Sequence, residues 1–185
     1  MGRWWDWNTG RVTTRPVLRP IAHHDVPDVL RLNELNVELL APMDHHRLEQ
    51  LIAWALRADV IEVDGVAAGF VITFGPGTSY DSLNYQWFSD LYGGDFHYLD
   101  RIVLDDRFRR HGIGTAVYDQ LEREAASVGR LALEVNLEPP NPASLAFHVS
   151  RGYVEVGRLG RPGKTVALLA KHLTPPLARL GDSPA

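Results

Sequence analysis

The sequence contains no cysteine, and this absence excludes a disulfide framework, a thiolate metal site and a cysteine nucleophile. Long apolar runs are missing too, since no stretch approaches the ~20 residues that a membrane-spanning helix needs. The formal net charge is -4, so the chain has no overall basic surface. We therefore expect no nucleic-acid partner and no membrane partner, and any site for an anion has to be a local cluster of basic residues.

What the sequence does contain is the composition of an ordinary globular protein. Its 185 residues are 45% hydrophobic and 23% charged, which is enough for one domain with a substantial core. The first residues, MGRWWDWNTGRVTTRP, carry no apolar segment followed by a cleavage-like site. We accordingly expect no secretion signal and a cytoplasmic protein.

Apolar patterns predict both strands and helices in the first half of the chain. Residues 15–21 are expected to form the first strand, and two helices should follow, the second at 44–58. Two further strands should meet in a hairpin at Asp64-Gly65, a dipeptide that favours tight hairpin turns. The residues expected on the buried sides of the two helices are Leu32, Leu35 and Leu39 in the first and Leu48, Leu51, Ile52, Ala55 and Leu56 in the second.

The second half begins with a long segment, residues 75–96, that is rich in Gly, Ser, Asp and aromatic residues. Connections of this length in a compact domain are usually functional or disordered, so we expect a long functional loop. The elements expected after it are a strand at 97–104, a helix closing at Gly129, a strand at 131–137, a short helix at about 141–151 and strands at 153–158 and 164–172.

The stretch RRHGIGTAVYDQL, which begins at Arg109, places basic side chains and two glycines at the start of a predicted helix. Backbone N–H groups at a helix start lack acceptors within the helix, and the helix dipole adds positive potential there. Arg110 and His111 would add charge, while Gly112 and Gly114 would let an anion approach bare backbone. The stretch also fits a plain turn between a strand and a helix, and the residues alone leave both interpretations open.

A second glycine-rich stretch, GRLGRPGKT at 157–165, ends like the phosphate-binding loop of nucleotide hydrolases. The first glycine that such a loop requires is replaced by Arg158, and a strand is expected where the loop would precede a helix. We therefore do not assign a nucleotide to it.

Two motifs in order make the chain resemble one family. The segment YLDRIVLDDRFRRHGIGTAVYDQL resembles the central motif of the GNAT acetyltransferases, in which a strand and an acidic turn precede R/Q-x-x-G-x-G/A at a helix start. Arg109, Gly112 and Gly114 fill the three defined positions. The segment LEVNLEPPNPASLAFHVSRGY resembles the next motif of that family, with Asn141 and Phe147 at matching positions. The order of elements agrees from residue 15 to about 173.

The resemblance implies an α/β fold with a strongly bent mixed sheet, whose fourth and fifth strands splay apart around acetyl-CoA. We expect the domain at 14–174, between an N-terminal extension at 1–13 and a flexible tail at 175–185. The pyrophosphate of acetyl-CoA would rest on the helix start, and the pantetheine arm would pair with the fourth strand, where the Val103 amide would polarise the thioester carbonyl. No metal is implied. The implied cofactor contacts are Ile102, Val103, Leu104, Arg109, Arg110, His111, Gly112, Ile113, Gly114, Thr115, Asn141 and Phe147.

The implied reaction is direct transfer of the acetyl group to a primary amine in a ternary complex, which needs a base because such amines are mostly protonated. Glu134 resembles the glutamate that acts as base in ribosomal-protein N-terminal acetyltransferases, and Asp100, expected on the strand face of Tyr98 and Ile102, is the alternative. Either carboxylate can instead be a structural partner. Many family members have a tyrosine as acid where this chain has His148, which is expected to be a proton donor or a plain helix-face histidine.

The expected long loop falls near the entrance for the acceptor. Asp81 would attract a cationic amine, Tyr85 and Trp87 would cover its apolar part, and Tyr80 or Tyr85 could supply the acid. The same aromatic residues can equally pin the loop to the core. The partner is then a small-molecule or peptide amine, whose identity the sequence leaves open.

Other functions and assemblies stay open. A chain without the usual tyrosine can be a catalytically silent CoA-binding or sensing module, and the same loop can serve transfer to oxygen or transfer of longer acyl chains. Tryptophans at 4, 5 and 7 would mark a homodimer interface if they are exposed. The histidine pairs at 23–24 and 45–46 lack partners at metal-ligand spacing and are expected at the surface or as caps.

Overall fold

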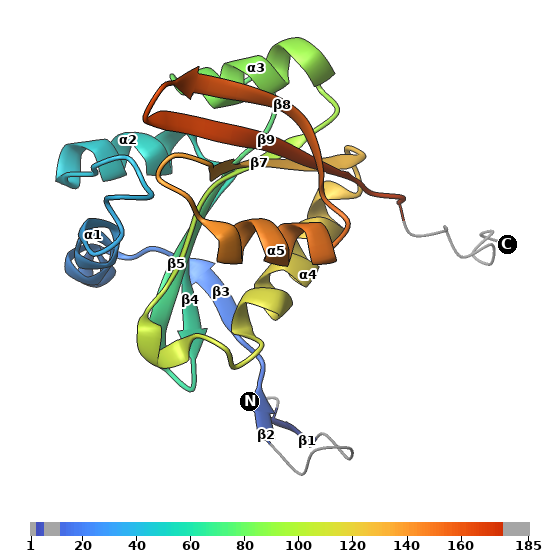
Figure 1. Cartoon of the computed structure of the whole chain (residues 1–185). Coiled ribbons are helices and arrows are strands. Elements are labelled where there is room, and N and C mark those ends of the chain that lie inside the picture. Colours follow the sequence, from blue (N-terminus) through green and yellow to red (C-terminus); the bar gives the residue numbers. More distant parts are fainter. Residues whose placement is uncertain (1–2, 6–11, 176–185) are drawn as a thin grey trace, which may run out of the picture.

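A seven-stranded sheet with helices on both faces forms the centre of the computed structural model (Figure 1). The structure describes residues 3–5 and 12–175, with side chains from Arg15 onward. Among these residues, no helix is long and apolar enough to cross a membrane. The elements are β1 Arg3–Trp5, β2 Val12–Thr14, β3 Val17–Pro20, α1 Val26–Glu34, α2 His45–Trp54, β4 Arg57–Val63, β5 Val66–Phe74, α3 Leu83–Tyr92, β6 His97–Leu104, α4 Ile113–Ala125, β7 Arg130–Asn136, α5 Pro142–Ser150, β8 Val154–Arg161 and β9 Lys164–His172.

The sheet opens between its only two parallel strands in the described part of the chain. The strand order is β3-β4-β5-β6-β7-β9-β8, and β6 and β7 pair over three positions, ending where Leu99 faces Leu133. Beyond that pair, β6 runs on to Leu104 and β7 to Asn136, so the two strands separate into a V (Figure 1). The predicted bent, mixed sheet with splayed strands is confirmed, because β6 and β7 are the fourth and fifth strands of that prediction.

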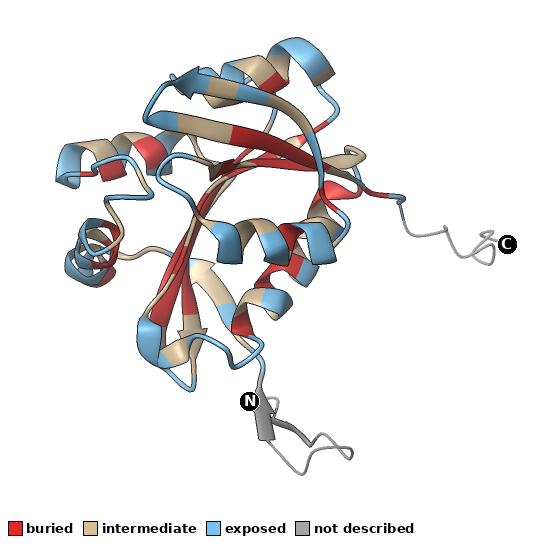
Figure 2. Ribbon diagram, viewed as in Figure 1, coloured by how far each residue is buried: buried red, intermediate tan, exposed pale blue. Residues whose placement is uncertain are grey.

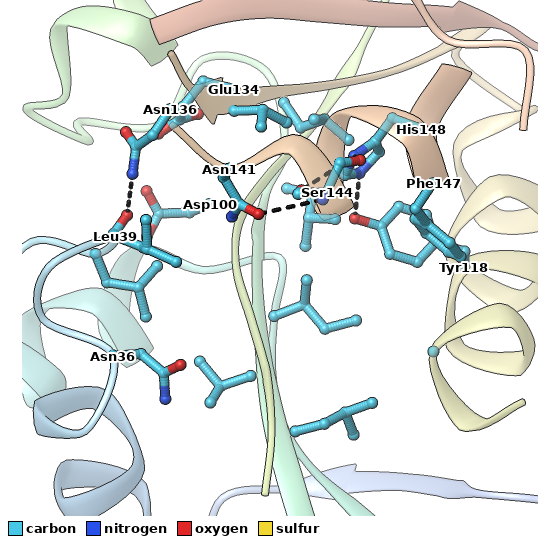
Figure 3. A pocket seen from close by; sticks show the side chains of 18 of the residues that line it. Asn36, Leu39, Asp100, Tyr118, Glu134, Asn136, Asn141, Ser144, Phe147 and His148 are labelled. Atoms are coloured by element: carbon cyan, nitrogen blue, oxygen red, sulfur yellow. Dashed lines mark hydrogen bonds between the residues drawn. The ribbon is translucent and has the colours of Figure 1, made fainter. Parts of the chain in front are cut away.

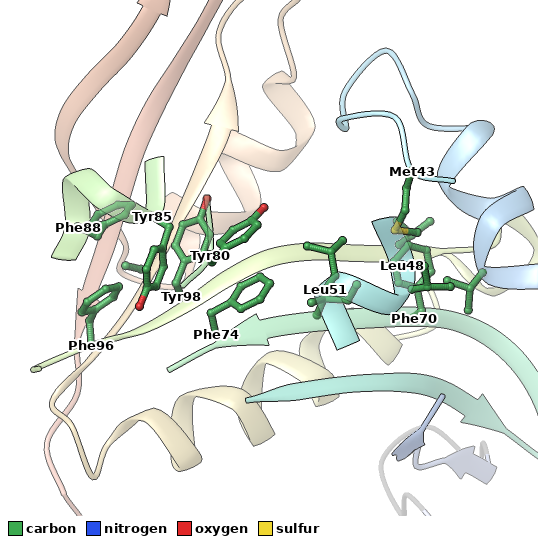
Figure 4. Packing of buried hydrophobic residues seen from close by; sticks show 14 of the residues in the cluster. Met43, Leu48, Leu51, Phe70, Phe74, Tyr80, Tyr85, Phe88, Phe96 and Tyr98 are labelled. Atoms are coloured by element: carbon green, nitrogen blue, oxygen red, sulfur yellow. The ribbon is translucent and has the colours of Figure 1, made fainter. Parts of the chain in front are cut away.

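Two hydrophobic cores lie on opposite faces of the sheet. The first core, on the side of α1, α2 and α3, contains Leu48, Phe70 and an aromatic group around Tyr98 (Figure 4). The second core lies under α4 and includes Val71 and Leu133. Neighbouring residues of β5 face opposite cores, as the two-residue period of a strand requires. Figure 2 shows the result, with buried residues along the central strands and the inner sides of the helices.

A β-bulge in β6 changes which side chains face each core. Ile72 pairs with Arg101 and Thr73 pairs with Leu99, so Asp100 is the extra residue. Tyr98 faces the first core, whereas Ile102 packs on the second. The expectation that Ile102 shares a face with Tyr98 is therefore wrong, because the bulge shifts the alternation by one residue.

Both N-terminal helices are shorter than predicted. The first helix, α1, ends at Glu34, so Leu35 is 71% exposed and Leu39 lies beyond the helix. The second helix, α2, ends at Trp54, and Leu56 beyond it is 54% exposed. Helical spacing of apolar residues thus continues past the true ends of both helices.

The segment predicted as a long loop contains a helix, α3. Ser82 caps its start by accepting a hydrogen bond from the Tyr85 N–H at 3.4 Å. Tyr85 and Phe88 are buried in the first core, and Trp87 packs against it. The many aromatic residues hide the helical spacing, so the sequence pattern does not reveal this helix.

Two predicted turns lie where the sequence placed them. Asp64 and Gly65 have left-handed backbone conformations at the β4–β5 turn, so the predicted hairpin is confirmed. The glycine-rich stretch at 157–165 lies in the β8–β9 hairpin, whose strands meet at Arg161 and Lys164. The predictions for the N-terminal extension lie largely outside the described residues: Trp7 and the side chains of Trp4 and Trp5 are not described, nor is the tail beyond residue 175.

Gly69 allows β5 and β6 to approach each other closely. A Cβ atom at Gly69 would lie 2.0 Å from the Val103 carbonyl oxygen, a distance that only a backbone shift can relieve. We expect Gly69→Ala to lower the free energy of unfolding by about 1–3 kcal/mol or more, a fall in Tm of about 2–4 °C per kcal/mol. The matched control is Gly75→Ala, whose Cβ would meet Leu56 at an ordinary 3.9 Å. Equal melting temperatures for the two variants would contradict this explanation.

Candidate functional site

A cavity of about 470 Å³ fills the V between β6 and β7 (Figure 3). Its walls come from β6, β7, α4, α5 and the segment that links α1 to α2. Ten of the residues that the sequence predicted for the site line this cavity: Asp100, Ile102, Val103, Leu104, Arg109, Gly114, Glu134, Asn141, Phe147 and His148.

The glycine-bearing loop ends the cavity at the start of α4. Gly112 is the N-cap residue with a left-handed φ of 77°, and Arg110 has a φ of 62°, so the loop curls tightly before the helix. The Ala116 N–H donates to the Gly112 carbonyl oxygen, and the amides before it point out of the helix start. Arg110, His111 and Thr115 are exposed around this opening, while Ile113 is buried. The loop therefore has the geometry of an anion cradle.

The Arg109 side chain folds back along the cavity wall. Its Nε donates to the Leu104 carbonyl oxygen at 3.2 Å, and Nη2 donates to Asn36 Oδ1 at 3.2 Å. Asp106 forms an ion pair with it at 3.0 Å. The Arg109 guanidinium thus lies between β6 and the α1–α2 segment, beside the path from the loop to the apex of the V.

Backbone groups of β6 face either β5 or the cavity, and the direction alternates along the strand. The close approach of Gly69 shows that the Val103 carbonyl points toward β5, and the Asp105 N–H likewise donates to Ala68 of the β5 strand at 2.9 Å. A residue's N–H and C=O lie on the same edge of a strand, so the Val103 amide faces β5 as well. The amides that face the cavity belong to Ile102 and Leu104, which corrects the expectation that Val103 polarises the thioester.

Glu134 lies on β7 near the apex of the V, on the face opposite Leu133. Its Oε2 accepts a short hydrogen bond from the Tyr98 hydroxyl. Burial raises the pKa of Glu134 to about 7, the Asp100 carboxylate adds to this rise, and hydrogen bonds from Tyr98 and Asn84 oppose it. The side chain keeps partial exposure through the cavity. A carboxylate with this pKa can accept a proton at neutral pH.

Asp100 belongs to a different set of contacts. Arg101 Nε donates to Asp100 Oδ2 at 2.9 Å, and both side chains are almost fully buried. The Tyr80 hydroxyl donates to Asp100 Oδ1 at 2.5 Å. Arg101 also donates to Asn33 Oδ1 at 2.6 Å and to the Ala41 carbonyl oxygen at 2.9 Å. This arrangement favours the charge-balancing role of Asp100 over the role of base.

His148 has a hydrogen-bond partner at each ring nitrogen. Nδ1 lies 2.7 Å from the Ser144 carbonyl oxygen, and Nε2 lies 2.7 Å from the Tyr118 hydroxyl. Burial lowers the pKa of His148, so the ring is neutral at physiological pH. These contacts favour the helix-face role of His148 over that of a protonated acid.

The predicted acceptor residues lie outside the cavity lining. Asp81 forms an ion pair with Arg47, which neutralises the charge expected to attract an amine. The Tyr85 hydroxyl donates to the Gly75 carbonyl oxygen inside the first core, and Trp87 lies over the β8–β9 hairpin near Gly157. Only Tyr80 approaches the site, through Asp100. The geometry favours the second interpretation, in which these aromatic residues hold the segment to the core.

The sequence reasoning missed the α1–α2 segment as a wall of the site. Asn136 Nδ2, on β7, donates to the Leu39 carbonyl oxygen at 2.7 Å, and so joins this segment to the far side of the V. Asn36, Leu39 and Leu40 line the cavity there. Asn136 lies two residues after Glu134 and so faces the same side of β7, which could have indicated that it lines the site. The α1–α2 segment carries no sequence motif that would have predicted its position.

The histidine pairs belong to the surface. His23 and His24 are exposed at the turn before α1, and His45 and His46 are exposed in the first turn of α2. Within residues 15–175, no three acidic or histidine side chains gather closely enough to hold a metal ion.

Comparisons with known proteins agree with this geometry. The sequence model of the Acetyltransferase (GNAT) family matches residues 26–153. Among solved structures, Ard1 from Thermoplasma volcanium has a TM-score of 0.67 at 17% identity, covering 85% of this chain and 97% of that one. The ribosomal-protein-S18-alanine N-acetyltransferase from Escherichia coli has a TM-score of 0.62 at 19% identity, covering 90% and 99%.

A third similar structure contains a ligand. N-acetylglutamate synthase from Neisseria gonorrhoeae, in complex with coenzyme A and N-acetyl-glutamate, has a TM-score of 0.63 at 14% identity, covering 85% of this chain and 35% of that one. At these identities the structures show the shared fold alone. A search of curated proteins by sequence finds no match. Because the family model spans more than half of the sequence, the chain belongs to the acetyltransferase (GNAT) family and is an acyltransferase.

Proposed function

We propose that this protein transfers the acetyl group of acetyl-CoA to a primary amine by direct attack in a ternary complex. The observation that carries the proposal is the position of Glu134. Its carboxyl group lines the apex of an open V that ends in an anion cradle, and it accepts a hydrogen bond from Tyr98. A plain turn before α4 would need neither the carboxylate nor the cavity.

The residues present fit acetyl-CoA along the whole V. The amides at the start of α4 would bind the pyrophosphate, with Arg110 and His111 adding positive charge. The pantetheine arm would lie along β6, where Ile102 and Leu104 offer backbone groups that face the cavity. Asn141 and Phe147, at the start and middle of α5, would line the opposite wall. Acetyl-CoA supplies a thioester whose carbonyl carbon accepts a nucleophile.

Glu134 would act as the base. A primary amine with a pKa of ~10.4 arrives mostly as an ammonium ion, so it must lose a proton before it can attack. Glu134 takes one proton from the ammonium ion, and the freed lone pair forms the C–N bond at the thioester carbon. The nitrogen loses its second proton to water as the amide forms and the C–S bond breaks. The Ile102 N–H, which faces the cavity, would donate to the carbonyl oxygen as negative charge develops there.

The acceptor would be a small-molecule or peptide amine that reaches Glu134 past the α1–α2 segment. Leu39 and Leu40 offer it an apolar surface, while Asn36 and Asn136 offer hydrogen bonds. These side chains, rather than those of α3, are the ones we propose to determine which amine is acetylated.

The test measures binding and turnover separately. We expect acetyl-CoA at a hundred times its Kd to stabilise the protein by ~2.7 kcal/mol, which raises the Tm by about 2–4 °C per kcal/mol. CoA release should then accelerate with a primary alkylamine or with a short peptide that has a free α-amino group. Binding without release across such amines would point to a silent CoA-binding module. No thermal shift at saturating acetyl-CoA would overturn the assignment of the cofactor.

A further inference from the structure

Tyr118 and His148 form a buried hydrogen-bonded pair in the wall of the cavity. The two side chains are 3% and 4% exposed, and they come from α4 and α5. The Ser144 carbonyl oxygen can only accept a hydrogen bond, so the His148 Nδ1 at 2.7 Å from it must carry the proton. Nε2 of the neutral ring therefore accepts, and the Tyr118 hydroxyl at 2.7 Å donates to it. Without a ligand, the Tyr118 hydroxyl hydrogen thus points to His148 Nε2.

The Tyr118 hydroxyl can supply the proton that this chain lacks at position 148, where many family members have a tyrosine. An imidazole has no hydroxyl, and the single N–H of the neutral His148 ring is directed to the Ser144 carbonyl oxygen, so His148 itself offers no proton to the cavity. Tyr118 lies on the neighbouring helix α4, and its hydroxyl is hydrogen-bonded to the imidazole of His148. Figure 3 shows Tyr118, Ser144 and His148 together on the wall opposite Glu134, with the hydroxyl directed inward.

The surroundings of Tyr118 keep its hydroxyl protonated and place a cation beside its ring. Burial raises its pKa, so the hydroxyl keeps its proton at physiological pH. The Arg151 guanidinium lies 5.4 Å from the centroid of the Tyr118 ring and opposes this rise in pKa, because its charge stabilises a phenolate. Arg151 is held in place by ion pairs with Asp119 and Glu122.

We propose that Tyr118 is the catalytic residue that protonates the leaving thiolate, and that His148 is a positioning residue that orients its hydroxyl. This inference rests on the proposed acetyl transfer. When the C–S bond breaks, its electron pair passes to sulfur, and the thiolate takes the hydroxyl proton of Tyr118. The phenolate recovers a proton from water as CoA leaves. The sulfur, a stronger acceptor than the neutral imidazole, draws the hydroxyl hydrogen away from Nε2.

The experiment compares Tyr118→Phe with Tyr153→Phe. Tyr153 is a matched control, since it packs on His148 and Tyr118 and its hydroxyl donates to Glu122 instead of lining the cavity. CoA thiol release is measured with acetyl-CoA, with and without a primary alkylamine. We expect Tyr118→Phe to lower kcat by about 10²- to 10⁴-fold, with an unchanged acetyl-CoA thermal shift, and Tyr153→Phe to keep kcat close to that of the wild type.

A second variant, Tyr118→Phe with His148→Tyr, moves the phenol from α4 to α5. Recovery of kcat in this double variant would support a chemical role for the hydroxyl, because packing alone would not be restored by exchanging the two positions. The inference would be overturned if Tyr118→Phe kept a kcat near that of the wild type, or if Tyr118→Phe and Tyr153→Phe lowered kcat equally. Either result would leave the proposed function in place. A wild-type protein that releases no CoA would overturn the proposed function itself, and this inference with it.

Discussion

Glu134→Gln is expected to lower the rate of CoA release from acetyl-CoA by about 10²- to 10⁴-fold, the usual contribution of a general base. Glutamine keeps the shape and can still accept the hydrogen bond from Tyr98, but it cannot take a proton. In the wild type, kcat should rise with pH through about 7, as Glu134 loses its proton. In the variant this rise should disappear.

The control for this variant is Glu138→Gln, just beyond β7. Glu138 accepts hydrogen bonds from the Gly163 N–H and the Thr165 hydroxyl and does not line the cavity, so its replacement should leave the pH profile unchanged. If Asp100→Asn flattened the profile while Glu134→Gln did not, the base would be Asp100.

Glu134 also links stability to pH. Its pKa is raised from 4.5 to about 7 in the folded chain, so between these values the folded state binds more protons than the unfolded state. Stability from this group is complete below about pH 4.5 and is lost as the pH rises through 7. Glu134→Gln avoids this loss, and we expect its Tm to exceed that of the wild type at pH 8.

The second large effect is expected from Gly112→Glu, which should abolish the thermal shift with acetyl-CoA. A carboxylate at the start of α4 would occupy and repel the pyrophosphate site, and an affinity loss of a hundredfold or more removes nearly all of a ~2.7 kcal/mol stabilisation. Gly129→Glu is the matched control. Gly129 follows the other end of α4 and has a φ of 85°, and at both glycines an added Cβ atom would meet no other atom within 4 Å.

The two glycine variants carry similar backbone strain, so both should melt below the wild type without ligand. Only Gly129→Glu should keep the full shift with acetyl-CoA, and ADP should shift neither variant much. If Gly112→Glu kept the full thermal shift with acetyl-CoA, the loop would be a plain turn and not the pyrophosphate site.

The sequence predicted those features that depend on neighbouring residues. The strand at His97–Leu104, the helix after Gly112 and the hairpin at Asp64 follow from local spacing and turn chemistry. The prediction for Glu134 comes from its resemblance to a glutamate base in ribosomal-protein N-terminal acetyltransferases. Such patterns survive in a single sequence because each is complete within a few residues.

Features that depend on a distant partner could not be predicted in this way. The bulge at Asp100 exists only in register with β5, and it decides which amides of β6 face the cavity. Tyr118 lies 30 residues from His148, and Asn136 lies 97 residues from Leu39, so no local pattern relates the members of either pair. The ion pair that neutralises Asp81 depends on Arg47 in the same way.

Because only three residue pairs join β6 to β7, the protein's resistance to proteolysis should depend on bound acetyl-CoA. Beyond Leu99, β6 and β7 no longer pair with each other. In the proposed complex the pantetheine arm lies between them and forms hydrogen bonds with the free edge of β6. The amides of Ile102 and Leu104 should therefore exchange hydrogen slowly only while acetyl-CoA is bound. Resistance to proteolysis would rise with the acetyl-CoA concentration, so the metabolic state of a cell would help to set how long each copy survives.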